Sequence, residues 1–362
     1  MSSRRKAMRI ILPVFALALA GAMHFGGPLE PLPARIALVC LAAVTLVVTV
    51  FVVVHHAEAV AQRIGEPYGT LLLTFAVTTI EVSVIVSMML KGANNPSLAR
   101  ESVFSTVMIV CTGLVGICLT LGGWRHQYQD IKRQGTSAFL AVLIALSVLT
   151  LILPDYTLAT KPGTFSTAQL IFVSALSVLL YGAFVFAQTD RHRDDFVFHV
   201  ETEDGTGEIA TSASASIALL ATGLVGVVLL AELVASEVER GLIAFHVPQV
   251  DAVIGALIAL LVLMPEGVAA IRAALSNELQ RSLNVALGSA CATIGLTIPA
   301  VAVASLVTGR DLDLGLGQGD TVLLVLALTI SVVSFSTGKT TVLTGLVHLV
   351  VFVAYLLLVI VP

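Results

Sequence analysis

Long apolar runs, each ended by a short polar segment, recur from one end of the chain to the other. A membrane-spanning helix needs about 20 mostly apolar residues. Eleven stretches qualify, and the breaks between them carry Gly, Pro, Asn or charge, as loops do. They are roughly residues 9–24, 35–54, 67–90, 102–122, 137–153, 166–187, 216–235, 249–271, 283–307, 320–336 and 341–361. The pattern predicts an all-α polytopic membrane protein with about eleven transmembrane helices, the first, fifth and tenth being short.

The composition supports this interpretation. Hydrophobic residues make up 57% of the 362 residues and charged ones only 12%, whereas soluble domains are about half apolar and a quarter charged. No polar stretch is long enough to form a soluble domain. The four cysteines lie in apolar segments without a CxxC motif, which indicates free thiols. The basic segment MSSRRKAMR is interpreted as the cytoplasmic end of the first helix.

The distribution of Lys and Arg orients the chain. With the N-terminus in the cytoplasm, thirteen of the nineteen basic residues fall in cytoplasmic segments and six in external ones. Because cytoplasmic loops of membrane proteins carry an excess of Lys and Arg, we expect a multi-pass protein with a cytoplasmic N-terminus and an external C-terminus.

The longest polar connection lies near the middle of the chain and is acidic. Residues 1–30 contain the N-terminal tail and the first helix, residues 190–214 form the acidic linker, and the two flanking segments hold five predicted helices each. An odd number of helices per half makes the halves insert with opposite topology, as in many secondary transporters. We therefore predict one leading helix followed by two inverted five-helix repeats, residues 31–189 and 215–362.

Two carboxylates lie deep inside predicted helices, Glu81 in the third and Glu266 in the eighth. Each costs about 2.5–3.5 kcal/mol on insertion scales, so a functional site is the first hypothesis. The alternative is a protonated Glu that is hydrogen-bonded to a neighbouring helix. Glu81 follows Glu66 by fifteen residues, and Glu266 follows Asp251 by fifteen, from opposite sides of the membrane. A two-fold axis in the membrane plane brings such carboxylates together, which favours one shared site.

Polar and small side chains share faces with these carboxylates. Thr70, Thr74 and Thr78 fall on the face of Glu81 at helical spacing. Around Glu266 the corresponding stripe is made of small residues, closed by a polar one: Gly255, Ala259, Ala270, Ala273 and Asn277. The ninth predicted helix carries Ser289 and Thr293. We expect these threonines, Asn277, Ser289 and Thr293 to line an ion pathway; back-bonding of the hydroxyls and close helix packing are the alternatives.

Three segments carry a family resemblance: GEPYGTLLLTFAVTTIEVSVIVSMML, MPEGVAAIRAALSNELQRSLNVALGSACATIGLTIPA and FSTGKTTVLTGLVHL. The chain resembles the bacterial Cha-type calcium/proton antiporters of the cation/calcium exchanger superfamily over nearly its whole length. The resemblance implies a protein of the bacterial inner (plasma) membrane in which Glu81 and Glu266 bind the cation and take up the exchanged protons. Many exchangers of this superfamily have Gly-Asn where this chain has Val77-Thr78 and Val262-Leu263, which leaves ion choice open.

The chemistry agrees with this resemblance. Ca²⁺ prefers several oxygen ligands, carboxylates above all. Two ionised glutamates supply a charge of −2, which balances the +2 charge of the cation. The function expected is Ca²⁺/H⁺ antiport by alternating access; Na⁺/H⁺ or K⁺/H⁺ antiport by the same pair is the alternative. The partners expected are inorganic cations, protons and the lipid bilayer, with no cofactor, nucleotide or nucleic acid. STGKT, residues 336–340, lacks the first glycine of a phosphate-binding loop, and the sequence does not predict an enzyme.

Several isolated residues have weaker interpretations. Glu66 either gathers cations at the cytoplasmic entrance or complements the dipole of the third helix. Glu232 is expected to be a solvated acid at the outer interface. His348 is expected to be a packed, hydrogen-bonded histidine rather than a proton relay, and His55 and His56 are placed on a cytoplasmic turn.

Overall fold

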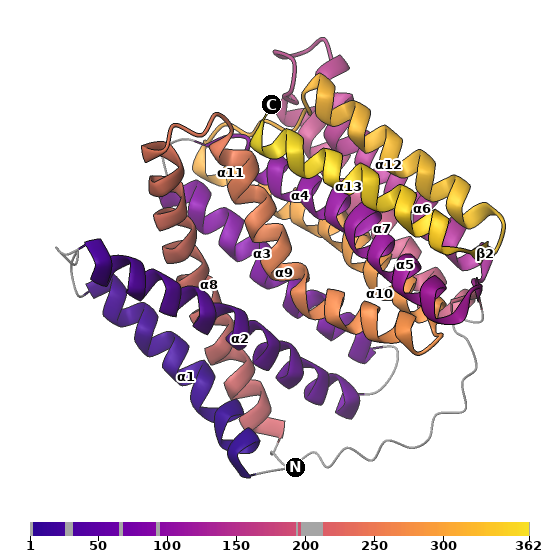
Figure 1. The fold of residues 1–362 in the computed structure, drawn as a ribbon. Coiled ribbons are helices and arrows are strands. Elements are labelled where there is room, and N and C mark those ends of the chain that lie inside the picture. Colours follow the sequence, from indigo (N-terminus) through magenta and orange to yellow (C-terminus); the bar gives the residue numbers. More distant parts are fainter. Residues whose placement is uncertain are drawn as a thin grey trace. The chain divides into compact units, whose positions relative to one another are not determined.

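The computed structural model describes residues 3–25, 32–64, 68–91, 95–192, 195–196 and 213–361, and nearly all of them are helical. Eleven helical rods follow one another in these ranges (Figure 1). They are α1 (Ser3–Phe25), α2 (Leu32–Ile64), α3 (Tyr68–Lys91), a rod of α4 (Leu98–Met108), η1 (Ile109–Leu114) and α5 (Val115–His126), a rod of α6 (Arg133–Ser147), η2 (Val148–Ile152) and η3 (Leu153–Tyr156), α7 (Thr167–Phe186) with η4 (Ala187–Arg191), α8 (Ala213–Ala244), α9 (Val250–Leu275), a rod of α10 (Leu279–Ala292), η6 (Thr293–Thr297) and α11 (Ile298–Thr308), α12 (Gln318–Ser336) and α13 (Val342–Ile360). The prediction of an all-α fold is confirmed, and helical rods are present at the first, fifth and tenth predicted helices, the three that were short.

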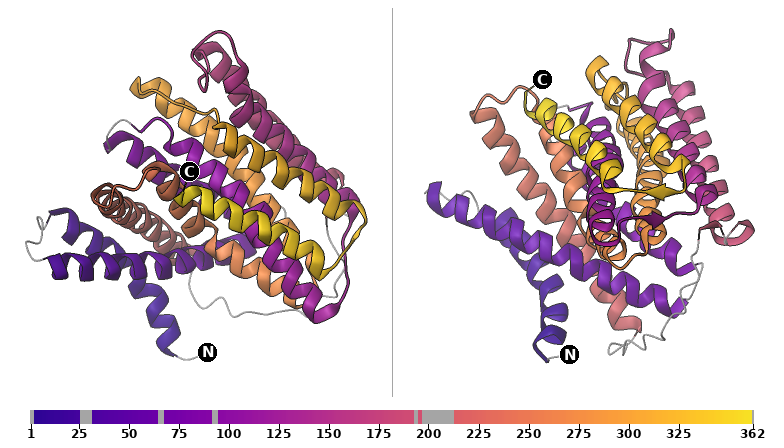
Figure 2. Two further views of the ribbon diagram at one scale, coloured as in Figure 1. Left: turned by 45° about the horizontal axis from the view of Figure 1, so that its top comes forward. Right: turned by 45° about the vertical axis from the view of Figure 1, so that its right-hand side comes forward.

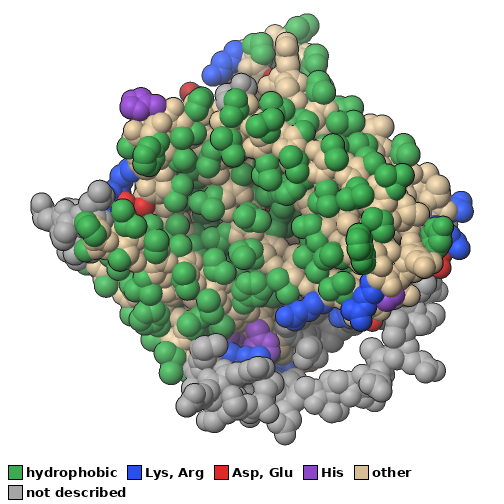
Figure 3. Space-filling model, viewed as in Figure 1, with side chains coloured by type: hydrophobic (Ala, Val, Ile, Leu, Met, Phe, Trp, Pro, Cys, Tyr) green, Lys and Arg blue, Asp and Glu red, His purple; other side chains and the backbone are tan. Residues whose placement is uncertain are grey.

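Most of these rods can cross a membrane. Among the described residues, nine helices are long and apolar enough to do so, while α1 and α3 contain the shorter apolar stretches Arg9–Phe25 and Phe75–Leu90. Large apolar side chains on the outside of α13, such as Leu343 and Val350, are each 69% exposed. Figure 3 shows hydrophobic side chains over the helix faces in view, with Lys and Arg gathered towards the helix ends. Such surfaces suit lipid, and the protein is a polytopic membrane protein.

Two features of the rods were not predicted. In the part of the chain that the structure describes, four π-helical turns, η1, η2, η4 and η6, interrupt or end helices. In addition, two-residue strands β1 (Gln129–Asp130) and β2 (Lys339–Thr340) pair antiparallel, with Gln129 opposite Thr340. This small sheet links the segment after α5 to the segment before α13.

Contacts divide the chain into two compact units, Met1–Gly92 with Glu201–Val247, and Ala93–Val200 with Pro248–Pro362. The first unit contains α1, α2, α3 and α8, and the second contains the remaining helices. Each unit takes helices from both predicted five-helix segments, so the compact units do not coincide with the predicted repeats. The division at residues 190–214 stays a prediction.

In the first unit, α8 packs against α1, α2 and α3, and α2 also packs against α1 and α3. Glycines allow close approaches between these helices. A Cβ on Gly226 of α8 would lie 3.1 Å from the backbone nitrogen of Leu17 in α1. Arg35 of α2 forms a salt bridge with Glu237 of α8 at 2.6 Å. Glu237, near the end of α8, therefore has a partner within the same unit, and α8 continues past this residue to Ala244.

In the second unit, α9 packs against α4, α5 and α10, and α13 packs against α5, η1 and α12. The α5–α13 pair runs side by side in Figures 1 and 2. Small residues again set the spacing, since a Cβ on Gly116 of α5 would lie 2.9 Å from the Leu349 side chain of α13. Tyr355 of α13 donates a 2.8 Å hydrogen bond to the buried Ser105 hydroxyl of α4.

Arg100 joins two segments of the second unit at the beginning of α4. Its Nε and Nη2 atoms donate to Glu101 Oε1 at 2.9 and 2.7 Å. Its Nη1 atom donates to the Gly315 carbonyl at 2.8 Å, in the segment between α11 and α12. Only 9% of the Glu101 side chain is exposed, so the guanidinium compensates most of the cost of burying that carboxylate.

Replacing Arg100 with methionine is expected to lower the free energy of unfolding by about 3 kcal/mol, because Glu101 stays buried without its cation. Thermal unfolding in detergent, followed by intrinsic fluorescence, measures this. The matched control is the double variant Arg100→Met/Glu101→Leu, which removes both charges and should recover most of the loss. A double variant as unstable as the single one contradicts this explanation.

Candidate ion-binding site

Glu81 lies in α3, in the first unit, and its side chain is only 2% exposed. Thr78, nearly one turn earlier, is 7% exposed. Residues 70 and 74 belong to the same helix, but their side chains, like the whole of residue 66, lie outside the described part of the structure. The proposed roles of Thr70, Thr74 and Glu66 therefore stay predictions.

Glu232 does not occupy the place that the sequence indicated. The sequence predicted that this helix ends near residue 235 and that Glu232 is a solvated acid at the interface. Instead α8 continues to Ala244, and Ser87 of α3 donates a 2.5 Å hydrogen bond to Glu232 Oε2. Glu232 therefore contacts the helix that carries Glu81, six residues beyond it along α3. Its signal in the sequence was a lone acid in an apolar run, the same signal that identified Glu81.

Glu266 lies in α9, in the second unit, and is partly buried directly after the buried Pro265. A small residue of α9 permits the close helix packing that the sequence analysis gave as an alternative. A Cβ on Gly255 would lie 2.7–2.8 Å from backbone atoms of Glu101 and Ser102 in α4. Next to Glu266, a Cβ on Gly267 would lie 3.7 Å from Leu114 Cδ1, the last residue of η1.

The helix that follows each carboxylate helix contains a π-helical turn at almost the same spacing. η1 begins at Ile109, 28 residues after Glu81, and η6 begins at Thr293, 27 residues after Glu266. A π-turn leaves backbone groups outside the regular hydrogen-bonding ladder and is frequent at functional sites. Within the second unit, η1 contacts α10 and η6 contacts α4.

The remaining predicted pathway residues lie in the second unit. Thr293 is 4% exposed at the beginning of η6, and Ser289 is partly buried on α10. Asn277 lies in the turn after α9, exposed and with a positive φ of 63°. Its side-chain oxygen accepts a 3.2 Å hydrogen bond from Gln129 Nε2. Asn277 is thus beyond the end of α9, which itself continues for about two and a half turns after Glu266.

His348 is confirmed as a packed, hydrogen-bonded histidine. Its side chain is completely buried, and both ring nitrogens have partners, the Cys111 carbonyl and the Ser334 hydroxyl. The prediction for His55 and His56 was wrong, because α2 continues through both of them to Ile64. Arg9 donates to His55 Nε2 at 2.7 Å and its carbonyl lies 3.1 Å from His56 Nε2.

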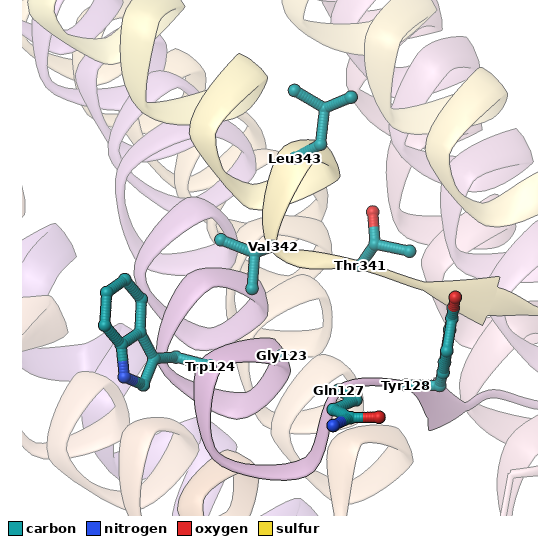
Figure 4. A pocket seen from close by; sticks show the side chains of 7 residues that line it. All are labelled: Gly123, Trp124, Gln127, Tyr128, Thr341, Val342 and Leu343. Carbon is teal, nitrogen blue, oxygen red and sulfur yellow. The ribbon is translucent and has the colours of Figure 1, made fainter.

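Neither a metal cluster among the described residues nor the groove at the beginning of α13 includes the two glutamates. Among the residues that the structure describes, no group of three or more His, Cys, Asp or Glu side chains could hold a metal ion. A shallow groove of about 500 Å³ lies where α5 ends and α13 begins (Figure 4). Its lining residues include no acid: Gly123, Trp124, Gln127, Tyr128, Thr341, Val342 and Leu343. The candidate ligands remain Glu81 and Glu266, one in each unit.

Comparison with known proteins identifies the family. A family model described as sodium/calcium exchanger protein matches residues 35–189 and 215–361. The putative ionic transporter y4hA of Sinorhizobium fredii is 45% identical over 359 residues, which cover 97% of this chain and 95% of the relative. The sodium-potassium/proton antiporter ChaA of Escherichia coli is 37% identical over 361 residues, which cover 98% of this chain and 96% of the relative.

Solved structures share the fold. The H⁺/Ca²⁺ exchanger CAX superposes with a TM-score of 0.70 at 12% identity, over 98% of this chain and 89% of that one. Native YfkE superposes with a TM-score of 0.69 at 17% identity, over 98% of this chain and the whole of that one. The chain therefore belongs to the sodium/calcium exchanger family and is a membrane-embedded ion antiporter rather than an enzyme.

Proposed function

We propose that this antiporter exchanges Ca²⁺ for protons by alternating access, with Glu81 and Glu266 binding either the cation or the protons. The observation that carries the proposal is the pair of carboxylates inside apolar helices at matching places. Glu81 stands ten residues before the end of α3, and Glu266 nine residues before the end of α9. Carboxylates at such depth are costly to insert and typically mark ion pathways.

The nearly equal spacing of the two π-turns from the two carboxylates supports the inverted-repeat organisation. Each proposed repeat then supplies one carboxylate helix and one π-turned helix, and the family match also falls into two segments, residues 35–189 and 215–361. In such transporters the site lies where the two repeats face each other. Thr78, Ser289 and Thr293 are the described hydroxyls that we propose as pathway groups; Thr70, Thr74, Asn277 and the entrance residue Glu66 complete the proposal.

Charge balance explains the coupling. Two carboxylates close together in a medium of low dielectric cannot both stay ionised and empty at low cost, so an emptied site gains affinity for protons. A site that holds either Ca²⁺ or protons stays near neutral, whereas an empty, doubly charged site does not. Protons that enter from one side therefore displace the cation, and the two fluxes run in opposite directions.

A monovalent cation is the second candidate, favoured by one of the relatives. The Escherichia coli relative, 37% identical, is a sodium-potassium/proton antiporter. Na⁺ or K⁺ needs one negative charge where Ca²⁺ uses two, so one of the two carboxylates then keeps a proton while the cation is bound. The same residues serve both candidates, and only the ion and the number of protons differ.

Proteoliposomes with an imposed pH gradient distinguish the candidates. Purified protein is reconstituted, and uptake of Ca²⁺, Na⁺ and K⁺ is measured at matched gradients, with empty liposomes as the control. We expect saturable Ca²⁺ uptake that collapses when an ionophore removes the pH gradient. Uptake of Na⁺ or K⁺ but not Ca²⁺ selects the second candidate, and uptake that is insensitive to the pH gradient refutes proton coupling for both.

We also propose the bacterial inner membrane as the location, with the N-terminus in the cytoplasm. Both sequence relatives are bacterial, and a proton gradient is available across that membrane. The orientation is supported by the excess of Lys and Arg in the segments that it makes cytoplasmic.

A further inference from the structure

The side chain of His348 is hydrogen-bonded to two elements of the second unit, η1 and α12. Its Nδ1 atom lies 2.7 Å from the Cys111 carbonyl oxygen in η1, and its Nε2 atom lies 2.9 Å from Ser334 Oγ in α12. The neighbouring Phe335 ring stacks on the imidazole, with ring centroids 6.2 Å apart and an interplanar angle of 26°. The ring is completely buried, so its orientation is fixed on both edges and on one face.

The Cys111 carbonyl is available to His348 because of the π-turn. In a continuous α-helix the Val115 N–H would donate to the Cys111 carbonyl, four residues earlier. Here the Val115 N–H reaches the Val110 and Thr112 carbonyls instead. The turn therefore releases the Cys111 oxygen from this bond, and a buried carbonyl without a donor costs about 1–3 kcal/mol. The imidazole provides the donor.

These contacts also assign the proton on the ring. A carbonyl oxygen can only accept, so Nδ1 carries the hydrogen that faces Cys111. In the neutral ring Nε2 then accepts from the Ser334 hydroxyl. The two ends of the imidazole are thus chemically distinct: Nδ1 donates to the carbonyl of the π-turn, and Nε2 accepts from Ser334.

The π-turn also touches the helix of Glu266. α9 contacts η1, and Leu114 at the end of η1 faces Gly267, which follows Glu266 directly. We propose that His348 is a positioning residue: by donating to the Cys111 carbonyl it fixes the π-turn against α9 and so sets the geometry of the ligand at Glu266. This inference rests on the proposed function, since it assigns His348 a part in the affinity for the transported cation.

Substitutions at His348 separate its two ends. His348→Asn keeps a donor at the position of Nδ1, His348→Gln keeps a polar group only at the position of Nε2, and His348→Leu removes both. Ser334→Ala removes the partner at Nε2 and leaves Nδ1 unchanged. Two readouts are taken: amide hydrogen exchange of residues 109–116 in the purified protein, and the cation KM and maximal rate of exchange in proteoliposomes.

We expect faster exchange of the η1 amides and an increase in KM of about tenfold in His348→Gln and His348→Leu, the size that one lost hydrogen bond allows. The maximal rate should change little. His348→Asn and Ser334→Ala should stay close to wild type in both readouts. The inference is overturned if His348→Asn resembles His348→Leu, if all four variants match wild type, or if only the maximal rate falls. The hydrogen-exchange readout does not depend on transport, so failure of the proposed function, seen as a wild-type protein without exchange, is recognised separately.

Discussion

Glu81→Gln and Glu266→Gln are each expected to abolish proton-coupled cation transport, reducing the initial rate by about a hundredfold or more. Glutamine keeps the size of the side chain and its hydrogen-bonding oxygen, but it removes the charge and the titratable proton. Because both the cation and the protons are proposed to use these carboxylates, neither flux can continue. Initial uptake rates in proteoliposomes at matched protein content measure the effect.

The control for this pair is Glu278→Gln. Glu278 lies outside the helices, at the N-terminal cap of α10, where it pairs with the exposed Arg281 at 3.1 Å. A surface pair of this kind contributes about 0–1 kcal/mol, so this variant should transport at nearly the wild-type rate. Near-normal proton-driven uptake by either Glu81→Gln or Glu266→Gln contradicts the proposed site.

Gly255→Leu is expected to destabilise the second unit by about 3 kcal/mol or more and to leave little folded protein. At this glycine, α9 approaches the backbone of α4, and a Cβ would stand 2.7–2.8 Å from Glu101 and Ser102 atoms. Backbone atoms cannot move aside as the end of a flexible side chain can, so the two helices must separate. Size-exclusion chromatography in detergent and thermal unfolding measure the loss.

A helical glycine with free space provides the matched comparison. Apart from its chain neighbours and the nearby backbone of its own helix, Gly182 of α7 has no atom within 4 Å of the position that a Cβ would occupy. Gly182→Ala should therefore keep or slightly raise stability, because alanine favours helix more than glycine does. If Gly255→Leu elutes and melts like Gly182→Ala, the close contact between α4 and α9 is not present in the folded protein.

The helices were predictable because lipid imposes a simple requirement, a long apolar run for every crossing. Their ends were harder to locate. The segment around His55 and His56 and the segment after Glu232 contain polar residues that resemble loops, yet α2 and α8 continue through them. In each case a partner from another helix pairs with the polar groups: Arg9 contacts His55, and Arg35 contacts Glu237.

No local sequence pattern predicted the π-turns. A π-turn differs from an α-turn by one residue, and the residues that satisfy its released carbonyl are distant in sequence, as His348 is from Cys111. The same holds for Ser87 and Glu232, which are 145 residues apart. Sequence reasoning identified Glu81 and Glu266 because a lone charge in an apolar helix is costly. It could not assign the side chains that surround them.

Reciprocal coupling is the most direct test of the central claim that cations and protons alternate at one pair of carboxylates. Proteoliposomes are loaded with Ca²⁺, diluted into Ca²⁺-free buffer at equal internal and external pH, and followed with a trapped pH-sensitive dye. The outward Ca²⁺ gradient should acidify the lumen in wild type and leave it unchanged in Glu81→Gln and Glu266→Gln. Ca²⁺ efflux without any change in luminal pH, with the membrane potential clamped, contradicts the claim.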